Sequence, residues 1–197
     1  VSAPAAATLV QRVFNALTDG AVHSGEQLAA GHGLTRSAIW KAVGALQELG
    51  VTIEATPNRG YRLAGPIVPL EAGQICASLA PEVRARLRHG EVAWSLASTN
   101  SALLAPTAHA ARNELGAGQF DFLAAEYQSA GRGRNARQWF APPGGALCLS
   151  LGWSFASLPK AASALSLAVG VCVVRALATV APLAVRLKWP NDLVVDD

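Results

Sequence analysis

Apolar residues recur at helical spacing in the first third of the chain. Residues 9–17 are apolar at positions three to four residues apart, which is the period of one helix face. A second helical segment follows Ser24, where Gln27 can complete a capping box, and a third follows Thr35 and ends at Gly50. The pattern therefore predicts three helices, of which the second is barely two turns long.

The pattern changes from helical spacing to alternation after the third helix. Residues 51–55 and 61–63 alternate between apolar and polar, and a turn signal at residues 57–60 lies between them. This predicts a hairpin with Arg59 at its tip. A short helix, a turn, a longer helix and a two-stranded wing form a winged helix-turn-helix, which places the start of the second helix of the motif in the major groove of DNA.

Polar residues at the start of the third helix and at the wing tip are candidates for DNA contacts. Arg36 can read a guanine edge, while Lys41 and Arg59 can neutralise phosphates. A winged helix that docks a protein or is merely structural remains the alternative. The predicted DNA-binding residues are Thr35, Arg36, Ser37, Lys41 and Arg59.

A proline- and glycine-rich seam at residues 64–69 separates a small block from a larger one. We expect a winged-helix domain at 1–65, a linker at 66–70 and a second domain at 71–197. In the larger block, strands are separated by unequal loops and few helices, which is typical of an α+β fold with a mixed sheet. The expected strands are 91–96, 121–127, 146–153, 185–189 and 193–195, and the expected helices are 98–104 and 161–178.

The composition excludes a disordered chain. Of the 197 residues, 51% are apolar and 15% are charged, which provides ample material for a core. The net charge of +3 is not gathered into a polybasic tail, so any DNA binding must come from individually placed contacts.

The sequence predicts neither a membrane span nor a secretory signal. The apolar run at 161–174 is shorter than the roughly 18 residues that a span needs, and we interpret it as a core helix. The N-terminus lacks a basic region followed by an apolar stretch. Cys76, Cys148 and Cys172 lack metal-binding or redox spacing and are expected to be small buried side chains. A cytoplasmic, reducing location with no membrane partner follows.

A loop rich in glycine and arginine carries the strongest chemical signal. Its glycines resemble a dinucleotide-binding fingerprint, but residues 142–145 are Pro-Pro-Gly-Gly and prevent the helix that such a fingerprint must open. At an effective dielectric near 20, each arginine about 4 Å from a phosphate gains about 4 kcal/mol before desolvation. The loop therefore favours an anionic ligand, with a solvated basic loop as the alternative. Its charged and aromatic members are Arg132, Arg134, Arg137 and Trp139.

Two further signals surround this loop. Lys188 ends an otherwise apolar strand, where its ammonium needs an anionic partner, either a ligand or Asp192. Residues 98–100, Ser-Thr-Asn, lie at a strand-to-helix junction, and Gln128 ends the strand that enters the loop. Together these residues describe a pocket with neutral polar groups on one side and cations on the other.

Several motifs in the chain resemble those of the bifunctional biotin protein ligase and biotin repressor family. They are SGEQLAAGHGLTRSAIWKAV, NRGYRL, STN, AEYQSAGRGRNARQWFAPPGGALCLSLGW and RLKWPNDL. The combination of the arginine loop with KWPND is the specific part of the match. The resemblance implies an α+β chain in which a winged helix-turn-helix precedes a mixed-sheet, class II synthetase-like ligase domain.

The resemblance also implies an activity. Biotin and ATP, with Mg²⁺, would form biotinyl-5'-adenylate, and biotin would then pass to a lysine of a biotin carboxyl carrier domain. Lys188 and Arg134 would be the catalytic residues. Biotin would be held by Ser98, Thr99, Asn100, Gln128, Gly131, Arg132, Gly133, Arg134 and Lys188, and the nucleotide by Arg134, Arg137, Trp139 and Asn191. No protein-bound metal site is expected.

The sequence departs from the family pattern in three places. Ala97 stands where an acidic residue is common, and residues 135–136 replace a more basic, glycine-rich stretch. The sequence stops at Asp197, before the further strand and small β-domain that the family normally has. We therefore expect an incomplete catalytic domain with weak or no turnover at this length.

Two other functions remain open. Lipoate-type protein ligases use the same fold and adenylate chemistry but lack the N-terminal reader. A regulator that senses biotin and binds operator DNA without transferring biotin would need no carrier protein. The resemblance further implies a possible homodimer that presents two wings to a two-half-site operator.

Overall fold

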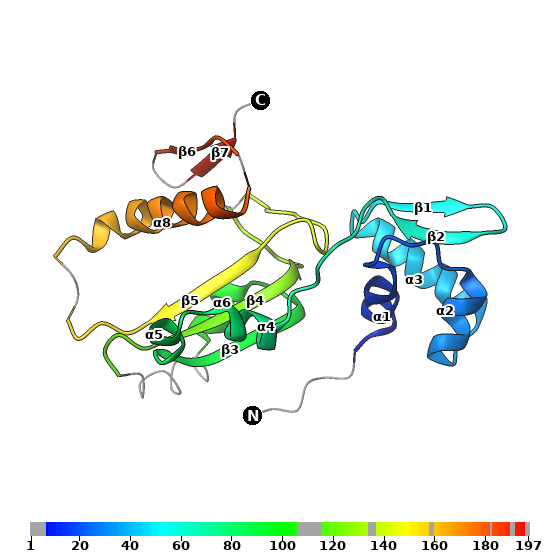
Figure 1. Ribbon diagram of the computed structural model, residues 1–197, viewed down its shortest axis with the longest axis horizontal. Coiled ribbons are helices and arrows are strands. Elements are labelled where there is room, and N and C mark those ends of the chain that lie inside the picture. Colours follow the sequence, from blue (N-terminus) through cyan, green and yellow to red (C-terminus); the bar gives the residue numbers. More distant parts are fainter. Residues whose placement is uncertain are drawn as a thin grey trace. The chain divides into compact units, whose positions relative to one another are not determined.

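The computed structural model describes residues 7–105, 116–133, 137–157, 160–181, 183–189 and 192–195 (Figure 1). The chain divides into two compact units, Val1–Ser154 and Phe155–Asp197. The first unit contains the helix-turn-helix region and a three-stranded sheet, and the second contains one long helix and a hairpin.

The N-terminal region has the three helices and the hairpin that the sequence predicts. They are α1 (Leu9–Leu17), α2 (Gly25–His32), α3 (Arg36–Glu48), β1 (Ile53–Thr56) and β2 (Gly60–Leu63). Helix α1 contributes Phe14 and α3 contributes Ile39 and Leu46 to a core in which these side chains are fully buried. The apolar spacing of the sequence thus becomes the inner face of each helix.

Side-chain caps define where α2 and α3 begin. The Ser24 hydroxyl accepts from the Gln27 backbone N–H, and the Gln27 side chain accepts from the Ser24 N–H, which completes the predicted capping box. The Thr35 side chain accepts from the Ala38 N–H at 3.3 Å. The Thr35 cap, together with Gly33 at a φ of 64° after the end of α2, fixes the turn between α2 and α3, which the sequence predicted as the turn of the motif.

The wing is closed by its own turn and is joined by backbone hydrogen bonds to the segment before α2. Asn58 has a φ of 60°, and the Arg59 N–H donates to the Thr56 carbonyl at 3.0 Å, which closes the turn between β1 and β2. His23 and Tyr61 exchange two backbone hydrogen bonds of 2.9 Å each. Gly60, at a φ of 130°, permits this pairing because a Cβ there would overlap the His23 carbonyl.

The second half of this unit is built on a mixed sheet with the order β3-β4-β5. Strands β3 (Leu87–Leu96) and β4 (Phe120–Gln128) run parallel, and β5 (Cys148–Trp153) runs antiparallel to β4. This confirms the predicted mixed sheet. The helices of this half are α4 (Ala72–Ser78), α5 (Pro81–Arg84) and α6 (Thr99–Leu104), of which only α6 was predicted.

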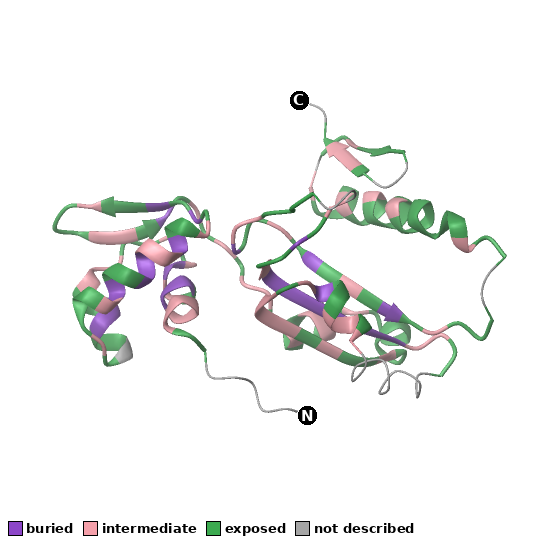
Figure 2. Cartoon of the chain, turned by 180° about the vertical axis from the view of Figure 1, so that it is seen from behind, coloured by how far each residue is buried: buried purple, intermediate pink, exposed green. Residues whose placement is uncertain are grey.

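The central strand β4 is the buried element of the sheet. Residues 120–126 are all buried, which Figure 2 shows in purple. The run includes Asp121, which accepts from the guanidinium of Arg88 at 3.1 and 3.3 Å. A buried carboxylate is tolerated there because a cation compensates its charge.

The unit Phe155–Asp197 contains η2 (Ala162–Ala164), α8 (Leu165–Val180), β6 (Val185–Lys188) and β7 (Asp192–Val195). Strands β6 and β7 correspond to the strands expected at 185–189 and 193–195, and the structure pairs them as an antiparallel hairpin. None of the residues of α8 is buried, so the expectation of a core helix is wrong for this structure. A hairpin of two four-residue strands is too small to cover a helix of 16 residues.

The apolar helix is longer than the apolar run at 161–174, so the expectation that it is too short to span a membrane is wrong. The helical stretch Ala162–Val180 continues through Arg175 and is long and apolar enough to cross a membrane by length and composition alone. A single helix of this kind is weak evidence for a span. The expectation for the cysteines holds only for Cys148, because Cys76 is half-buried and Cys172 is exposed.

Candidate active site and nucleic-acid interface

The parallel pairing of β3 and β4 brings two of the predicted binding segments together. Leu96 and Gln128 are register partners at the ends of their strands. Because the carboxyl ends of parallel strands meet at one edge of a sheet, residues 98–100 and Gln128 lie at the same edge. The sequence predicted each segment, but only the strand direction brings them into contact.

A network of hydrogen bonds joins these segments at Thr99, which is 3% exposed. The Thr99 N–H donates to Gln128 Oε1 at 2.7 Å, and its hydroxyl donates to the same oxygen at 3.1 Å. The Thr99 hydroxyl also lies 2.8 Å from the Ser150 hydroxyl of β5. Ser98 caps α6 by accepting from the Ser101 N–H, and Asn100 is exposed.

Ser150 is a member of this network that sequence reasoning did not assign to the site. The signal was its position as a polar residue in an otherwise apolar strand. Its register partner on β4 is Leu123, five residues before Gln128, so no sequence motif connects it to Thr99. The contact follows from the antiparallel pairing of β5, which returns the chain across the site.

The arginine loop leaves the sheet edge directly after Gln128. Its described residues form a narrow turn in which the Trp139 N–H donates to the Gly131 carbonyl at 2.8 Å and the Gly133 N–H donates to the Arg137 carbonyl at 2.7 Å. A Cβ on Gly131 would lie 2.6 Å from the Trp139 carbonyl oxygen, so only glycine fits there. The side chains of Arg132, Arg137 and Trp139 are exposed and available to a ligand, while Arg134 lies outside the described residues.

A buried carboxylate lies on β4, two residues before Gln128. Glu126 is 6% exposed, and its Oε1 accepts from the Leu70 N–H at 2.6 Å. Burial raises the pKa of Glu126, an effect partly offset by backbone hydrogen bonds from Leu70 and Gly144. Glu126 therefore ties the segment before α4 and the turn after the arginine loop to the sheet. No sequence motif assigned a role to Glu126.

Lys188 belongs to the other unit. It is the last residue of β6, its side chain is exposed, and its register partner is Asp192 at the start of β7. Asn191 lies outside the described residues.

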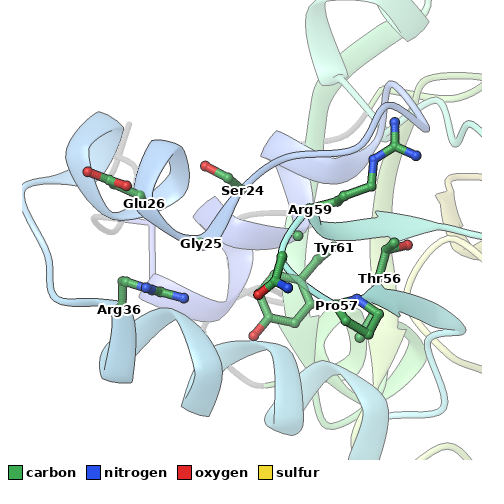
Figure 3. A pocket seen from close by; sticks show the side chains of 11 residues that line it. Ser24, Gly25, Glu26, Arg36, Thr56, Pro57, Arg59 and Tyr61 are labelled. Atoms are coloured by element: carbon green, nitrogen blue, oxygen red, sulfur yellow. The ribbon is translucent and has the colours of Figure 1, made fainter.

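The predicted DNA-binding residues lie on α3 and on the wing. Thr35, Arg36, Ser37, Lys41 and Arg59 are all exposed. A hollow of about 450 Å³ lies between the start of the helices and the wing, with Arg36 on one side and Arg59 on the other (Figure 3). Glu26 also lines it, so the hollow is not purely cationic. Arg36 and Arg59 nevertheless present exposed guanidinium groups at two separate points of this face, where each can contact DNA.

Comparison with known proteins matches both regions to families. Residues 11–62 match the HTH domain family, and residues 111–197 match the biotin/lipoate A/B protein ligase family. The chain therefore carries an N-terminal HTH domain followed by a ligase-family domain.

The relatives carry both regions in the same order. The chain is 39% identical to the bifunctional ligase/repressor BirA of Salmonella typhimurium and to that of Escherichia coli, over 96% of this chain and 55% of each relative. It is 30% identical to the BirA of Bacillus subtilis over 88% of this chain and 51% of the relative. These matches confirm the resemblance inferred from the motifs. The chain spans about half the length of these relatives.

A solved structure shows a weaker likeness. It is a crystal structure of biotin acetyl coenzyme A carboxylase synthetase from Helicobacter pylori with bound biotinylated ATP. The identity is 31%, the match covers 55% of this chain and 50% of the other, and the TM-score is 0.43.

Proposed function

We propose that this chain activates biotin with ATP and transfers it to a carrier protein. The biotin carboxylate would attack the α-phosphate of ATP, forming biotinyl-5'-adenylate and releasing pyrophosphate. A lysine amine of a biotin carboxyl carrier domain would then take the biotinyl group and release AMP. The observation that carries this proposal is the meeting of Thr99, Gln128 and the arginine loop at one sheet edge.

The residue roles are part of the proposal. Ser98, Thr99, Asn100 and Gln128 would hold the biotin head, and the loop residues Gly131 to Arg134 would close over biotin and adenylate. Arg134 and Lys188 would neutralise the charge that develops at the α-phosphate, while Arg137, Trp139 and Asn191 would hold the nucleotide. This reaction needs alignment and cations rather than a side-chain nucleophile.

Mg²⁺ would arrive with the ATP phosphates. Among the described residues, no three His, Cys, Asp or Glu side chains gather into a group that could hold a metal ion. Mg²⁺ is commonly bound through substrate phosphates, so this is compatible with magnesium-dependent chemistry. When bound, the ion would supply positive charge that offsets the negative charge of the leaving pyrophosphate.

Biotin-dependent exchange of pyrophosphate into ATP tests the proposal directly. Lys188→Ala should lower the exchange rate by orders of magnitude and leave biotin binding, measured by calorimetry, largely intact. Lys160→Ala removes another exposed lysine of the same unit and should leave both unchanged. Exchange that survives Lys188→Ala would refute the assigned role, and a wild-type chain that neither binds biotin nor exchanges would refute the function.

A lipoate-type ligase is the enzyme alternative, since the matched family covers biotin and lipoate ligases. A relative from Mycobacterium tuberculosis named biotin--[acetyl-CoA-carboxylase] ligase, 39% identical over 54% of this chain and 40% of the relative, favours biotin. Competition between biotin and lipoate for the chain separates the two, because a lipoate ligase would release biotin when lipoate is added.

We further propose that the N-terminal domain binds operator DNA in the cytoplasm, as a repressor that responds to biotin. Arg36 would contact a base edge from α3, and Lys41 and Arg59 would contact phosphates. Duplex binding should weaken steeply with salt, and Lys41→Ala should lower the slope of log K against log salt by about 1. Arg84→Ala, outside the HTH domain, is the control. Binding without salt dependence would contradict the proposal.

A non-catalytic sensor would bind both biotin and DNA but show no exchange. Ligand and DNA must then influence each other's affinity equally. Operator binding with and without biotin, beside the exchange assay, decides between enzyme and sensor. A homodimer on a two-half-site operator and the absence of a membrane partner also remain proposals, testable by ultracentrifugation with DNA and by vesicle sedimentation.

A further inference from the structure

Trp40 is the one side chain of α3 whose exposure its chemistry does not explain. It is 67% exposed, although it lies in the middle of a well-capped helix that buries four other residues. Large aromatic side chains gain most from burial, and tryptophan is enriched at contact surfaces, where one end of the ring is apolar and the other is polar.

The position of Trp40 puts it beside the residues proposed to contact DNA. It follows Arg36 by four residues and Ser37 by three, so it lies one helical turn further along the same face. Lys41 is its neighbour in sequence and is also exposed. The buried Val43 follows Trp40 by three residues, so the exposed ring lies at the border between the core-facing side of α3 and this polar side.

The charges around this face fit a polyanion. The first turn of α3 has no acidic residue, so the positive end of its helix dipole is not opposed there. On the wing, Glu54 is paired with Arg62, whose Nε donates to it at 2.7 Å, while Arg59 is exposed at the tip. An apolar protein partner would gain little from this arrangement, whereas duplex DNA would match it.

We propose that Trp40 reads the 5-methyl group of a thymine in the major groove. This inference rests on the proposed DNA binding and assigns one specificity contact within it. The thymine methyl is the apolar feature that the major groove presents, and apolar side chains recognise it. Four residues of helix span about 6 Å along the axis, so this thymine should lie about two base pairs from the base that Arg36 contacts.

Selection of bound duplexes from a random library tests the proposal with the full chain. The wild-type chain should enrich a site with one strongly preferred thymine, and Trp40→Ala should lose that preference by at least about fivefold while the other positions stay enriched. Trp40→Phe should retain part of it. Glu48→Gln, at the far end of α3, is the matched control and should not change the selected site.

Replacing the thymine by deoxyuracil in the selected duplex removes only the methyl group. Wild-type affinity should fall about fourfold, the value expected for one buried methyl, and Trp40→Ala should bind both duplexes equally. The wild-type part of this test needs no variant and can refute the proposal by itself, because wild-type affinity that does not fall with deoxyuracil leaves no thymine methyl for Trp40 to read.

The outcomes separate this inference from the proposed function. If the wild-type chain enriches no sequence and binds duplexes without salt dependence, the DNA-binding proposal itself fails. If it enriches a site that Trp40→Ala also selects, or if deoxyuracil costs nothing at every thymine, DNA binding stands and the role of Trp40 is refuted. A uniform loss of affinity in Trp40→Ala without a change of preferred bases also refutes it.

Discussion

The HTH region and the unit Phe155–Asp197 treat their apolar residues in opposite ways. In the HTH region each helix and strand contributes to one core of fully or nearly fully buried side chains. In the second unit α8 is more apolar than any helix of the HTH region, yet Leu165 is 50% exposed and Val180 is 77% exposed. The difference lies in how many neighbours each helix has, since an apolar face is buried only when enough other elements surround it.

A strongly apolar sequence is therefore not enough to identify a core helix. Each helix of the HTH region has one apolar face and one polar face. The apolar faces pack against one another and form a complete core within about 60 residues. Helix α8 is apolar on nearly all sides, which indicates that it requires covering surfaces beyond its own hairpin.

The largest expected effect contrasts two leucines. Leu46→Ala should lower the free energy of unfolding by about 2–5 kcal/mol, because it leaves a cavity in a fully buried site. Leu165→Ala should cost less than about 1 kcal/mol because half of that side chain is already in water. Urea denaturation followed by circular dichroism measures both. Equal losses would show that α8 is buried in solution, and would contradict the difference in burial between α8 and the helices of the HTH region.

A smaller effect is expected at the polar network of the sheet. Thr99→Val keeps the side-chain volume but removes the hydroxyl that contacts Gln128 and Ser150, which should cost about 1–3 kcal/mol and weaken biotin binding. Ser101→Ala changes an exposed hydroxyl on the same helix and should be nearly neutral. Calorimetric unfolding and biotin titration of both variants provide the measurement. If Thr99→Val leaves the free energy of unfolding unchanged, the network contributes nothing to the stability of the first unit.

A glycine-to-alanine substitution can be made in both α3 and α8, and its effect on stability should differ between the two helices. Gly44 lies within α3, and a Cβ there would meet no atom within 4 Å in the described structure, so Gly44→Ala should stabilise the chain by about 0.5–1 kcal/mol. At Gly170 in α8 a Cβ would lie 2.5 Å from Leu187, so Gly170→Ala should gain less, since that side chain must move. Thermal unfolding of both variants checks the ranking, and a larger gain at Gly170 would contradict the packing of α8 on β6.

The smallest effect concerns pH. Because burial raises the pKa of Glu126, the folded chain binds this proton more readily than the unfolded chain. Its contribution to stability should therefore decline as pH rises from the ordinary pKa of glutamate to the raised value. The difference in unfolding free energy between the wild type and Glu126→Gln isolates this effect. A difference that grows in favour of the wild type with rising pH would reverse the assigned sign.

The sequence was sufficient for the local elements but not for their contacts. Apolar spacing and caps such as Ser24 and Thr35 predicted the helices of the HTH region because these signals act within one turn. The helices α4 and α5 escaped prediction because they are short and expose most of their residues.

The candidate site was predicted residue by residue but not as an arrangement. Thr99 and Gln128 were named as separate polar signals, and their contact depends on the parallel register of β3 and β4. Ser150 and Glu126 could not be assigned, since their partners lie 51 and 56 residues away in the chain. The burial of α8 was predicted wrongly because an apolar run reports what a helix requires, not what surrounds it.

The hydrogen bonds at Thr99 have a consequence for the direction of donation across the sheet edge. Gln128 Oε1 accepts both donors of Thr99, which orients the side-chain amide so that its nitrogen points away from Thr99. The Thr99 hydroxyl has only one proton, so Ser150 must supply the proton between the two hydroxyls. Donation therefore runs one way, from Ser150 on β5 through Thr99 on α6 to the side-chain oxygen of Gln128 on β4, which leaves the amide N–H groups of Gln128 as donors on the other side. A molecule that pairs with Gln128 at this edge must bring an acceptor, and one that brings only donors would leave that N–H without a partner.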